Sequence, residues 1–409
     1  MTRGYIAPLT AALLLSMMIH QAHCAQPLEG TPWLGAAFSG DKSNLEAFAK
    51  NGGKFIRLYG EEDAWVLDEA AKLGLKVIMG VWLEHPRRGF NLDDPKAVEE
   101  QNARIRDFVT QHRDHPALLA WGIGNEVELL QSDPRPAWRL VNKTAAMVKA
   151  IDQEHPTIMI VVNMGDDRLR ILADHSQHAD IIGINTYGDG LYGLPDRLQK
   201  AGIRKPVAIT EFGPLGQWDA TRKAWGAPLE LTGSQKAKFF RDAMAFIKES
   251  PQLVGGFAFV WGAKQEQTET WHGLLLKDGS LTPMTDALIE SWGKTVTNKA
   301  PEIRHASINT DVHHSGDDII AHVDAIDPEG QALVTEWIVR KESTDLRKGG
   351  DIESIPEQIP VHIRHNSVQQ LTFISPAPGA YRLFITVRDP SGKADTANLP
   401  FLVSDHETN

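Results

Sequence analysis

Eight apolar, strand-prone runs alternate with stretches that have the polarity pattern of amphipathic helices. Some runs, such as Ile158–Val162, are almost continuous Ile and Val, which is typical of parallel strands buried on both faces. Eight strand–helix repeats over about 260 residues match the size of a (β/α)8 barrel. The expected strands are Trp33–Ser39, Phe55–Gly60, Lys76–Leu83, Leu118–Glu126, Thr157–Asn163, Ile181–Gly188, Pro206–Gly213 and Gly255–Gly262.

The segments between these runs carry helix signals. Asp94-Pro95 and Gly233-Ser234 stand where a helix should begin, and Gly74 and Gly202 stand where a helix should end. The expected helices are Asn44–Ala49, Ala64–Leu73, Pro95–His112, Pro136–Asp152, Leu191–Ala201, Ser234–Lys248 and Pro283–Gly293.

An open, doubly wound sheet is the alternative architecture for such a pattern, and it normally carries a glycine-rich nucleotide fingerprint. Gly122-Ile123-Gly124 lacks the third glycine of that motif. The sequence therefore favours an α/β fold in which residues 26–298 form a TIM barrel.

The pattern changes near residue 299. From there to the end, short alternating strands such as Leu333–Val339 and Tyr381–Val387 are separated by turn signals such as Asp389-Pro390-Ser391-Gly392. About 100 residues of this kind indicate a β-sandwich. The closing strands resemble those of immunoglobulin-like modules of the PKD or cadherin type, so residues 299–409 are expected to form a smaller, all-β immunoglobulin-like domain.

Residues 1–25 have the layout of a secretory signal peptide, with Arg3, an apolar stretch and small residues near Ala25. The apolar stretch is too short to span a membrane. We therefore expect a secreted or periplasmic protein. Cys24, the single cysteine, could carry a lipid anchor, but His23 and Gln21 suit that recognition poorly.

The charge balance narrows the class of partner. Asp plus Glu number 53 against 42 Lys plus Arg, for a net charge of −11, which argues against nucleic acid as the main partner. The 16 histidines are scattered without the spacing of metal ligands, so no metal and no cofactor is expected. The oligomeric state cannot be read from the sequence.

Two glutamates stand at the ends of expected strands. Glu126 closes the fourth run and Glu211 lies near the end of the seventh. The carboxyl ends of barrel strands carry the chemistry of such folds, and an ionised carboxylate is badly placed there for stability alone. Two glutamates facing each other across a cleft are the apparatus of glycoside hydrolysis.

These residues resemble a known group of enzymes. Asn125-Glu126 on strand 4 with Glu211 on strand 7 resembles the glycoside hydrolases of clan A, which are (β/α)8 barrels. The stretch His115–Glu126 looks like the catalytic barrel of family 2. Ile56–Gly60 and Leu75–Trp82 look more like family 17, the β-1,3-glucan-active group.

The resemblance implies a retaining double displacement, with Glu126 as acid/base and Glu211 as nucleophile. Asn125 would hydrogen-bond the sugar 2-hydroxyl, and Arg57 would support the nucleophile. Tyr187 would hydrogen-bond the nucleophile, and Trp261 would be the platform beneath the sugar at the cleavage point.

The chain has 11 Trp but 5 Tyr, and flat indole faces can grip sugar rings. Trp82 follows strand 3, and Trp218 and Trp225 lie in the long segment after strand 7, so all three could line sugar subsites. Glu84 and His85 also follow strand 3 and could line the same subsites, and Trp271, in the segment after Trp261, is a further candidate for stacking on a sugar.

The sequence thus predicts a retaining glycoside hydrolase that cleaves a β-linked glucan or related polysaccharide. A β-glucan transglycosylase would use the same glycosyl-enzyme, and the residues do not separate the two activities. A non-catalytic carbohydrate-binding protein is the third interpretation. It would require a broken catalytic constellation, whereas all the expected residues are present. The C-terminal domain is expected to be a spacer or packing module.

Overall fold

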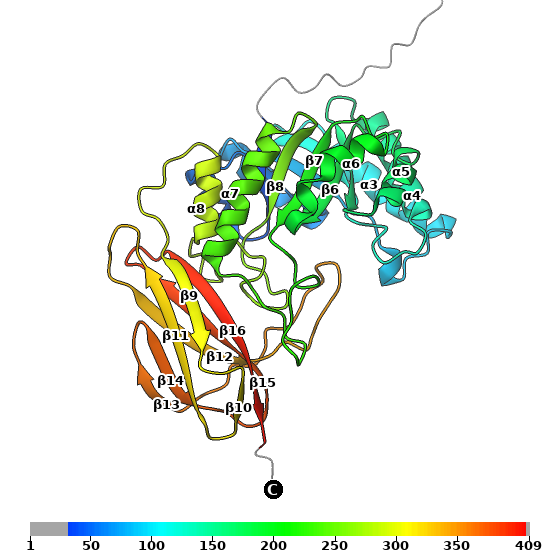
Figure 1. Cartoon of the computed structure of the whole chain (residues 1–409). Coiled ribbons are helices and arrows are strands. Elements are labelled where there is room, and N and C mark those ends of the chain that lie inside the picture. The colour runs from blue at the N-terminus through cyan, green and yellow to red at the C-terminus, as the bar shows by residue number, and fades with distance from the viewer. Residues whose placement is uncertain (1–31, 406–409) are drawn as a thin grey trace, which may run out of the picture. The chain divides into compact units, whose positions relative to one another are not determined.

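The computed structural model describes residues 32–405, and the predicted signal peptide lies outside them. Eight parallel strands close into a barrel in chain order (Figure 1). They are β1 (Trp33–Phe38), β2 (Phe55–Arg57), β3 (Lys76–Val81), β4 (Leu118–Ile123), β5 (Thr157–Val162), β6 (Ile181–Tyr187), β7 (Val207–Gly213) and β8 (Leu253–Trp261). The predicted barrel class is confirmed.

A helix follows each strand of the barrel. Asp94 caps α3 as predicted, because its carboxylate accepts from the backbone N–H groups of Lys96 and Ala97. The cap of α7 is Thr232 rather than the predicted Gly233-Ser234. The helices are α1 (Lys42–Lys50), α2 (Trp65–Lys72), α3 (Pro95–His112), α4 (Arg135–Ile151), α5 (Asp166–Ala173), α6 (Leu194–Lys200), α7 (Gly233–Glu249) and α8 (Pro283–Ser291), with short 3-10 turns η1 (Glu61–Asp63), η2 (Pro86–Arg88) and η3 (Gly188–Leu191).

Helix α5 was not among the predicted helices. It is eight residues long and buries Leu169 and Leu172 alone, so its apolar face is too narrow to give a clear periodic signal.

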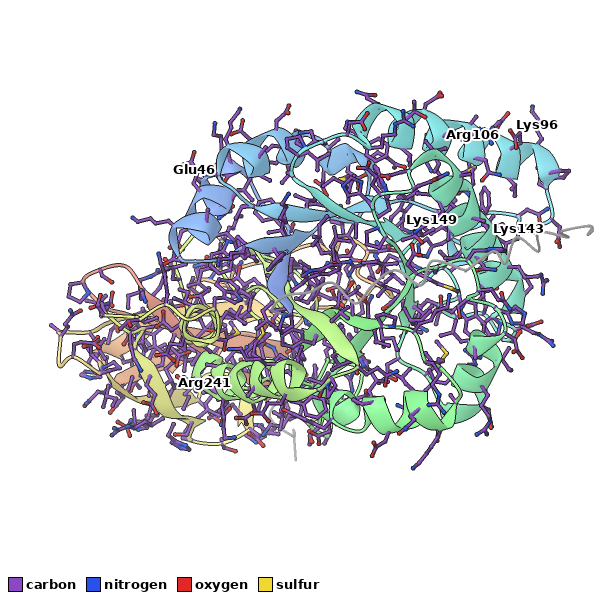
Figure 2. All side chains as sticks on the ribbon, turned by 90° about the horizontal axis from the view of Figure 1, so that it is seen from above. Glu46, Lys96, Arg106, Lys143, Lys149 and Arg241 are labelled. Atoms are coloured by element: carbon purple, nitrogen blue, oxygen red, sulfur yellow. The ribbon has the colours of Figure 1, made fainter. Side chains whose placement is uncertain are left out.

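The barrel has two apolar layers. Inside it, side chains such as Ile78, Ile158, Ala208 and Phe257 fill the space between the strands. A larger layer lies between the strands and the helices. Charged helix residues such as Glu46 and Lys96 lie on the outside (Figure 2).

Two four-stranded sheets follow the barrel, in the orders β10-β16-β15-β12 and β13-β14-β11-β9. Apolar residues of both sheets, among them Phe373 and Phe401, share one core, so the two sheets form a sandwich. The strands are β9 (Glu302–Ile308), β10 (Val312–His314), β11 (Asp318–Ile326), β12 (Val334–Lys341), β13 (Ile363–Asn366), β14 (Gln370–Ile374), β15 (Gly379–Arg388) and β16 (Ala394–Ser404).

The two parts are joined by the stretch between Ser291 and Glu302, and the predicted boundary at residues 298 and 299 falls within this stretch. Within residues 32–405, no helix is long and apolar enough to cross a membrane.

Candidate active site

Four polar side chains point into the mouth of the barrel from two strands. Ile56 and Leu58 belong to the outer apolar layer, so Arg57 and Tyr59 face inward. On β6, Ile182 and Ile184 likewise pack outward. The alternation therefore turns Asn185 and Tyr187 to the inside.

An irregularity in β7 brings Glu211 to the same place. Ile184 of β6 pairs with Ile209, but the next residue, Asn185, pairs with Glu211, which leaves Thr210 as an extra residue on β7. Bulges of this kind re-aim side chains and are common beside active sites. The Thr210 hydroxyl donates to Asn185 Oδ1 at 2.7 Å, and the Glu211 carboxylate turns toward Arg57 and the two tyrosines.

Three donors converge on the carboxylate of Glu211. Arg57 Nη1 and the Tyr59 hydroxyl bind Oε1 at 2.8 and 3.0 Å, and the Tyr187 hydroxyl binds Oε2 at 2.8 Å. Glu211 is 6% exposed and Arg57 is 1% exposed. Both oxygens of this buried carboxylate are thus held in place, and the bond from the guanidinium is of the strong, charge-assisted kind.

Glu126 lies in a different environment. Its carboxylate accepts one hydrogen bond, from Asn185 Nδ2 to Oε1 at 2.9 Å. Burial and the nearby negative charge of Glu211 raise the pKa of Glu126 to about 8. Its backbone has φ of 51°, a left-handed conformation that non-glycine residues rarely adopt and that is often found at functional sites. Glu126 is therefore held as a protonated acid at neutral pH.

Asn125 joins the two carboxyl groups through a hydrogen-bond network. Its Oδ1 accepts from Arg57 Nη2 at 2.6 Å and from Asn185 Nδ2 at 3.0 Å. With Oδ1 occupied by two donors, the Nδ2 group is the part of the amide left to meet a ligand. The structure thus brings together five predicted site residues: Arg57, Asn125, Glu126, Tyr187 and Glu211.

An aromatic cluster stands beside Tyr187. The Trp218 indole meets the Tyr187 ring edge to face at 5.3 Å and stacks on His272 at 5.9 Å. Trp218 is 50% exposed, so part of its surface is open to a ligand. His272 is buried, and burial lowers its pKa to about 3, which keeps the imidazole neutral.

The prediction for Trp261 is wrong. Trp261 is fully buried, packs against Phe48 at 5.1 Å and donates from Nε1 to the backbone carbonyl of Asn44. A side chain enclosed under α1 cannot offer a face to a sugar. The physical reason is a register shift: β1 residues Ala36 and Phe38 pair with Ala258 and Trp261, so β8 holds one extra residue and the alternation changes side.

Phe259 takes the inward position on β8. Its ring lies 6.1 Å from Tyr187 and 5.6 Å from His272, both edge to face. It therefore belongs to the aromatic cluster beside Glu211, where Trp261 was expected.

Trp82 packs against residues of its own loop. Its indole stacks on His85 at 4.9 Å, and the Arg88 guanidinium lies 5.4 Å from its ring centre. Trp82 thus belongs to the loop that follows β3, and its role as a sugar-binding residue stays a prediction.

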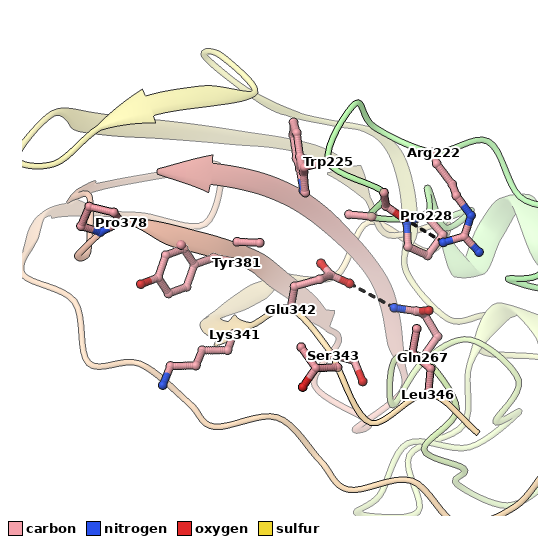
Figure 3. A pocket seen from close by; sticks show the side chains of 15 residues that line it. Arg222, Trp225, Pro228, Gln267, Lys341, Glu342, Ser343, Leu346, Pro378 and Tyr381 are labelled. Carbon is pink, nitrogen blue, oxygen red and sulfur yellow. Dashed lines mark hydrogen bonds between the residues drawn. The ribbon is translucent and has the colours of Figure 1, made fainter. Parts of the chain in front are cut away.

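Trp225 lies in another place altogether. It lines a cavity of about 440 Å³ between the segment after β7 and the sandwich, together with Lys341, Ser343 and Tyr381 (Figure 3). Neither Glu126 nor Glu211 lines this cavity.

Sequence reasoning missed Tyr59, Asn185, Phe259 and His272. Tyr59 and Asn185 each stand two residues from a predicted site residue on the same strand or its end, so a strict two-residue alternation would have found them. Phe259 and His272 depend on the β8 irregularity and on a long loop, for which the sequence carries no comparable signal. Among residues 32–405, no group of three or more His, Cys, Asp or Glu could hold a metal ion.

Residues 50–213 match the family model described as the TIM barrel domain of glycosyl hydrolases family 2. The matched stretch runs from before β2 to the end of β7 and contains all five residues of the network. The resemblance to clan A glycoside hydrolases is therefore confirmed for the barrel.

Solved structures show the same fold. A calcium-binding mutant of β-glucuronidase 2 from Bacteroides uniformis is similar with 14% sequence identity and a TM-score of 0.50, and the similarity covers 92% of this chain and 46% of that one. The same enzyme covalently bound to cyclophellitol-6-carboxylate aziridine gives 16% identity, a TM-score of 0.51 and the same coverage. This chain thus spans about half the length of these proteins. No curated protein sequence matches it significantly.

Proposed function

We propose that this protein is a retaining glycoside hydrolase that cleaves a β-linked glucan or a related sugar chain. The observation that carries the proposal is the unequal treatment of two neighbouring glutamates: Glu211 accepts three hydrogen bonds, whereas Glu126 accepts one and has a raised pKa. When the environments of two carboxyl groups differ in this way, the firmly hydrogen-bonded one is suited to be the nucleophile and the one with the raised pKa to be the acid.

In the first step, a Glu211 oxygen attacks the anomeric carbon while the bond to the departing oxygen breaks and Glu126 gives its proton to that oxygen. In the second step, Glu126 takes a proton from water, the water oxygen attacks the same carbon, and the ester bond to Glu211 breaks. Each step inverts the anomeric carbon, so the product keeps the β configuration. Asn125 Nδ2 is placed to hydrogen-bond a sugar hydroxyl during both steps.

The test uses three Glu→Gln variants of the whole chain. Glu211→Gln should lose at least about a thousandfold in kcat/KM on aryl β-glycosides, because it lacks the nucleophile. Glu126→Gln should lose about a hundredfold or more on oligosaccharides, whose sugar leaving group needs the proton that the acid supplies. Glu46→Gln is the matched control, since Glu46 is exposed on the outer face of α1 (Figure 2). NMR of the first-formed product should show the β anomer. Unchanged turnover in Glu211→Gln, or an α product, would overturn the mechanism.

The substrate screen should pair neutral β-glucans of different linkage with β-glucuronides. The acidic balance of the chain favours a neutral sugar chain over a polyanionic one. Cleavage of glucuronides with no action on glucans would refute the glucan assignment while leaving the retaining mechanism in place.

We also propose that the mature protein is exported, on the pattern of residues 1–25. Sequencing the N-terminus of the protein from the native cell envelope or medium tests this. A start at Met1 would contradict it.

A further inference from the structure

One segment of the sandwich reaches the loops that surround the candidate active site. It joins β12 to β13 and spans residues 342–362, and we call residues 348–351 its tip. Arg87 Nη2 donates to the backbone carbonyl of Gly349 at 3.2 Å, and Lys264 Nζ donates to that of Gly350 at 3.0 Å. Arg87 belongs to the loop after β3 and Lys264 to the loop after β8, so neighbouring tip residues hold both loops.

The closed order of the barrel locates this contact. On one side of the mouth, β3 and β8 are separated by β1 and β2 alone. There the barrel's own connections are short: three residues separate β1 from α1 and three separate β2 from η1. The tip therefore joins the two loops that flank the side of the mouth where the barrel's own connections are short.

Each candidate carboxyl group is connected to the tip. Glu126 is connected through the chain that follows it, and Glu211 is connected through packed aromatic rings. Leu129, three residues after Glu126, is a near neighbour of Gly349, because a Cβ placed on Gly349 would lie 2.8 Å from it. Lys264 Nζ lies 5.8 Å from the centre of the Phe259 ring, and Phe259 packs against Tyr187, which binds Glu211.

The sandwich also shapes the β8 loop. Gln267 has φ of 62°, in the left-handed region. Its backbone N–H donates to Glu353 at 2.6 Å, and its side-chain amide donates to Glu342 at 3.1 Å (Figure 3). A residue in this conformation needs such outside support, and here two glutamates of the sandwich provide it.

The carboxylate of Asp351 and three backbone carbonyls of the tip, those of Lys348, Gly349 and Gly350, already accept hydrogen bonds from the barrel. Asp351 accepts two hydrogen bonds from Arg87, at 2.9 and 3.1 Å, and one from Arg88. Arg87 also donates to the carbonyl of Lys348 at 3.0 Å. Acceptors that are already paired with the barrel limit a ligand by shape and do not hold it by hydrogen bonds.

We propose that the tip of the β12–β13 segment is a wall of the substrate-binding mouth, which limits how far a sugar chain extends over the β1–β2 side. This inference rests on the proposed function. It gives the sandwich a part in substrate selection, in place of the spacer role expected from the sequence.

Two glycine substitutions form a matched pair of tests. Gly349→Ala places a Cβ 2.8 Å from Leu129 and 2.9 Å from the Arg87 guanidinium, at a φ of 68°. Gly330→Ala, also in the sandwich, has φ of 78° and would meet nothing within 4 Å. Both carry the backbone cost of a left-handed alanine, so a difference between them reports the contact with the barrel. Asp351→Asn, which weakens the link to Arg87, is the second variant if Gly349→Ala fails to fold.

The main measurement is the ratio of kcat/KM on the longest oligosaccharide cleaved to kcat/KM on an aryl β-monoglycoside. Moving the wall should raise this ratio about fivefold, the effect of about 1 kcal/mol, and lengthen the products in Gly349→Ala and Asp351→Asn. Gly330→Ala should leave both unchanged. Hydrogen–deuterium exchange should become faster in residues 82–90 and 262–272 of Gly349→Ala and Asp351→Asn alone.

If the kcat/KM ratio and the product length are unchanged in both tip variants, the proposal that the tip is a wall is wrong, whether or not hydrogen–deuterium exchange changes. If the wild-type protein cleaves none of the substrates, the proposed function fails on its own account. The wall is then judged by oligosaccharide binding to the wild type and the variants, and equal affinities would overturn it.

Discussion

The charge of Glu211 should control the acidity of Glu126. Burial is the largest cause of the raised pKa of Glu126, and the negative charge of Glu211 is the second. Glu211→Gln removes that charge and keeps the shape of the side chain. We therefore expect the pKa of Glu126 to fall in this variant.

The size of the fall follows from Coulomb's law. Paired carboxyl groups of retaining glycosidases lie about 5.5 Å apart. At that separation and an effective dielectric constant of about 20, two unit charges interact by ~3 kcal/mol. Since a pKa change of one corresponds to about 1.4 kcal/mol, the pKa of Glu126 should fall by about 2, from about 8 toward about 6.

The assay is a 13C NMR titration of protein labelled at the glutamate carboxyl carbon, with Glu126→Gln used to assign the signal. Glu128→Gln is the control. Glu128 is also buried, and its negative charge raises the pKa of Glu126 by less than the negative charge of Glu211 does. A pKa of Glu126 that stays the same or rises in Glu211→Gln would refute the reasoning. A larger fall in Glu128→Gln than in Glu211→Gln would refute it equally.

Three further predictions concern stability and binding. Arg57→Lys should lower kcat/KM about a hundredfold or more in aryl glycoside assays and cost about 3 kcal/mol in denaturant unfolding, because one ammonium group cannot replace the bonds to Glu211, Asn125 and Thr210. The pKa of Glu126 is higher in the folded than in the unfolded chain, so the folded state binds the extra proton, and the free energy of unfolding falls as pH rises from about 4.5 to about 8. In urea unfolding, Glu126→Gln should therefore be stabilised relative to the wild type by more at pH 8 than at pH 5. An equal difference at the two pH values would contradict this. Trp261→Ala should lose about 3–5 kcal/mol of stability, whereas Trp218→Ala, at a half-exposed position, should raise KM with little change in melting temperature; the reverse pattern would restore Trp261 as the sugar platform.

Much of the fold can be predicted from local patterns in the sequence. Buried parallel strands such as β5 need continuous apolar runs, and helices need caps such as Asp94, so both leave periodic signals in the chain. A glutamate at the end of an apolar run breaks that pattern. That is why the sequence alone predicts Glu126 and Glu211 as site residues.

Their surroundings could not be predicted in the same way. The extra residue in β7 turns Glu211 toward Arg57, and the extra residue in β8 turns Trp261 away from the site. A shift in register is a property of two paired strands, so it cannot be recognised from the sequence of one strand alone. The network through Asn185 likewise joins strands that are distant in sequence.

The sequence by itself determined a barrel followed by a β-sandwich and placed two carboxyl groups at one end of the barrel, because burial and alternation act on residues near each other in the chain. The tertiary structure decided which residues bind each carboxyl group, which aromatic rings reach the mouth, and that Gly349 and Gly350 of the sandwich lie against Arg87 and Lys264 of the barrel. Those outcomes depend on contacts between segments up to 262 residues apart, and local sequence patterns carry no record of them.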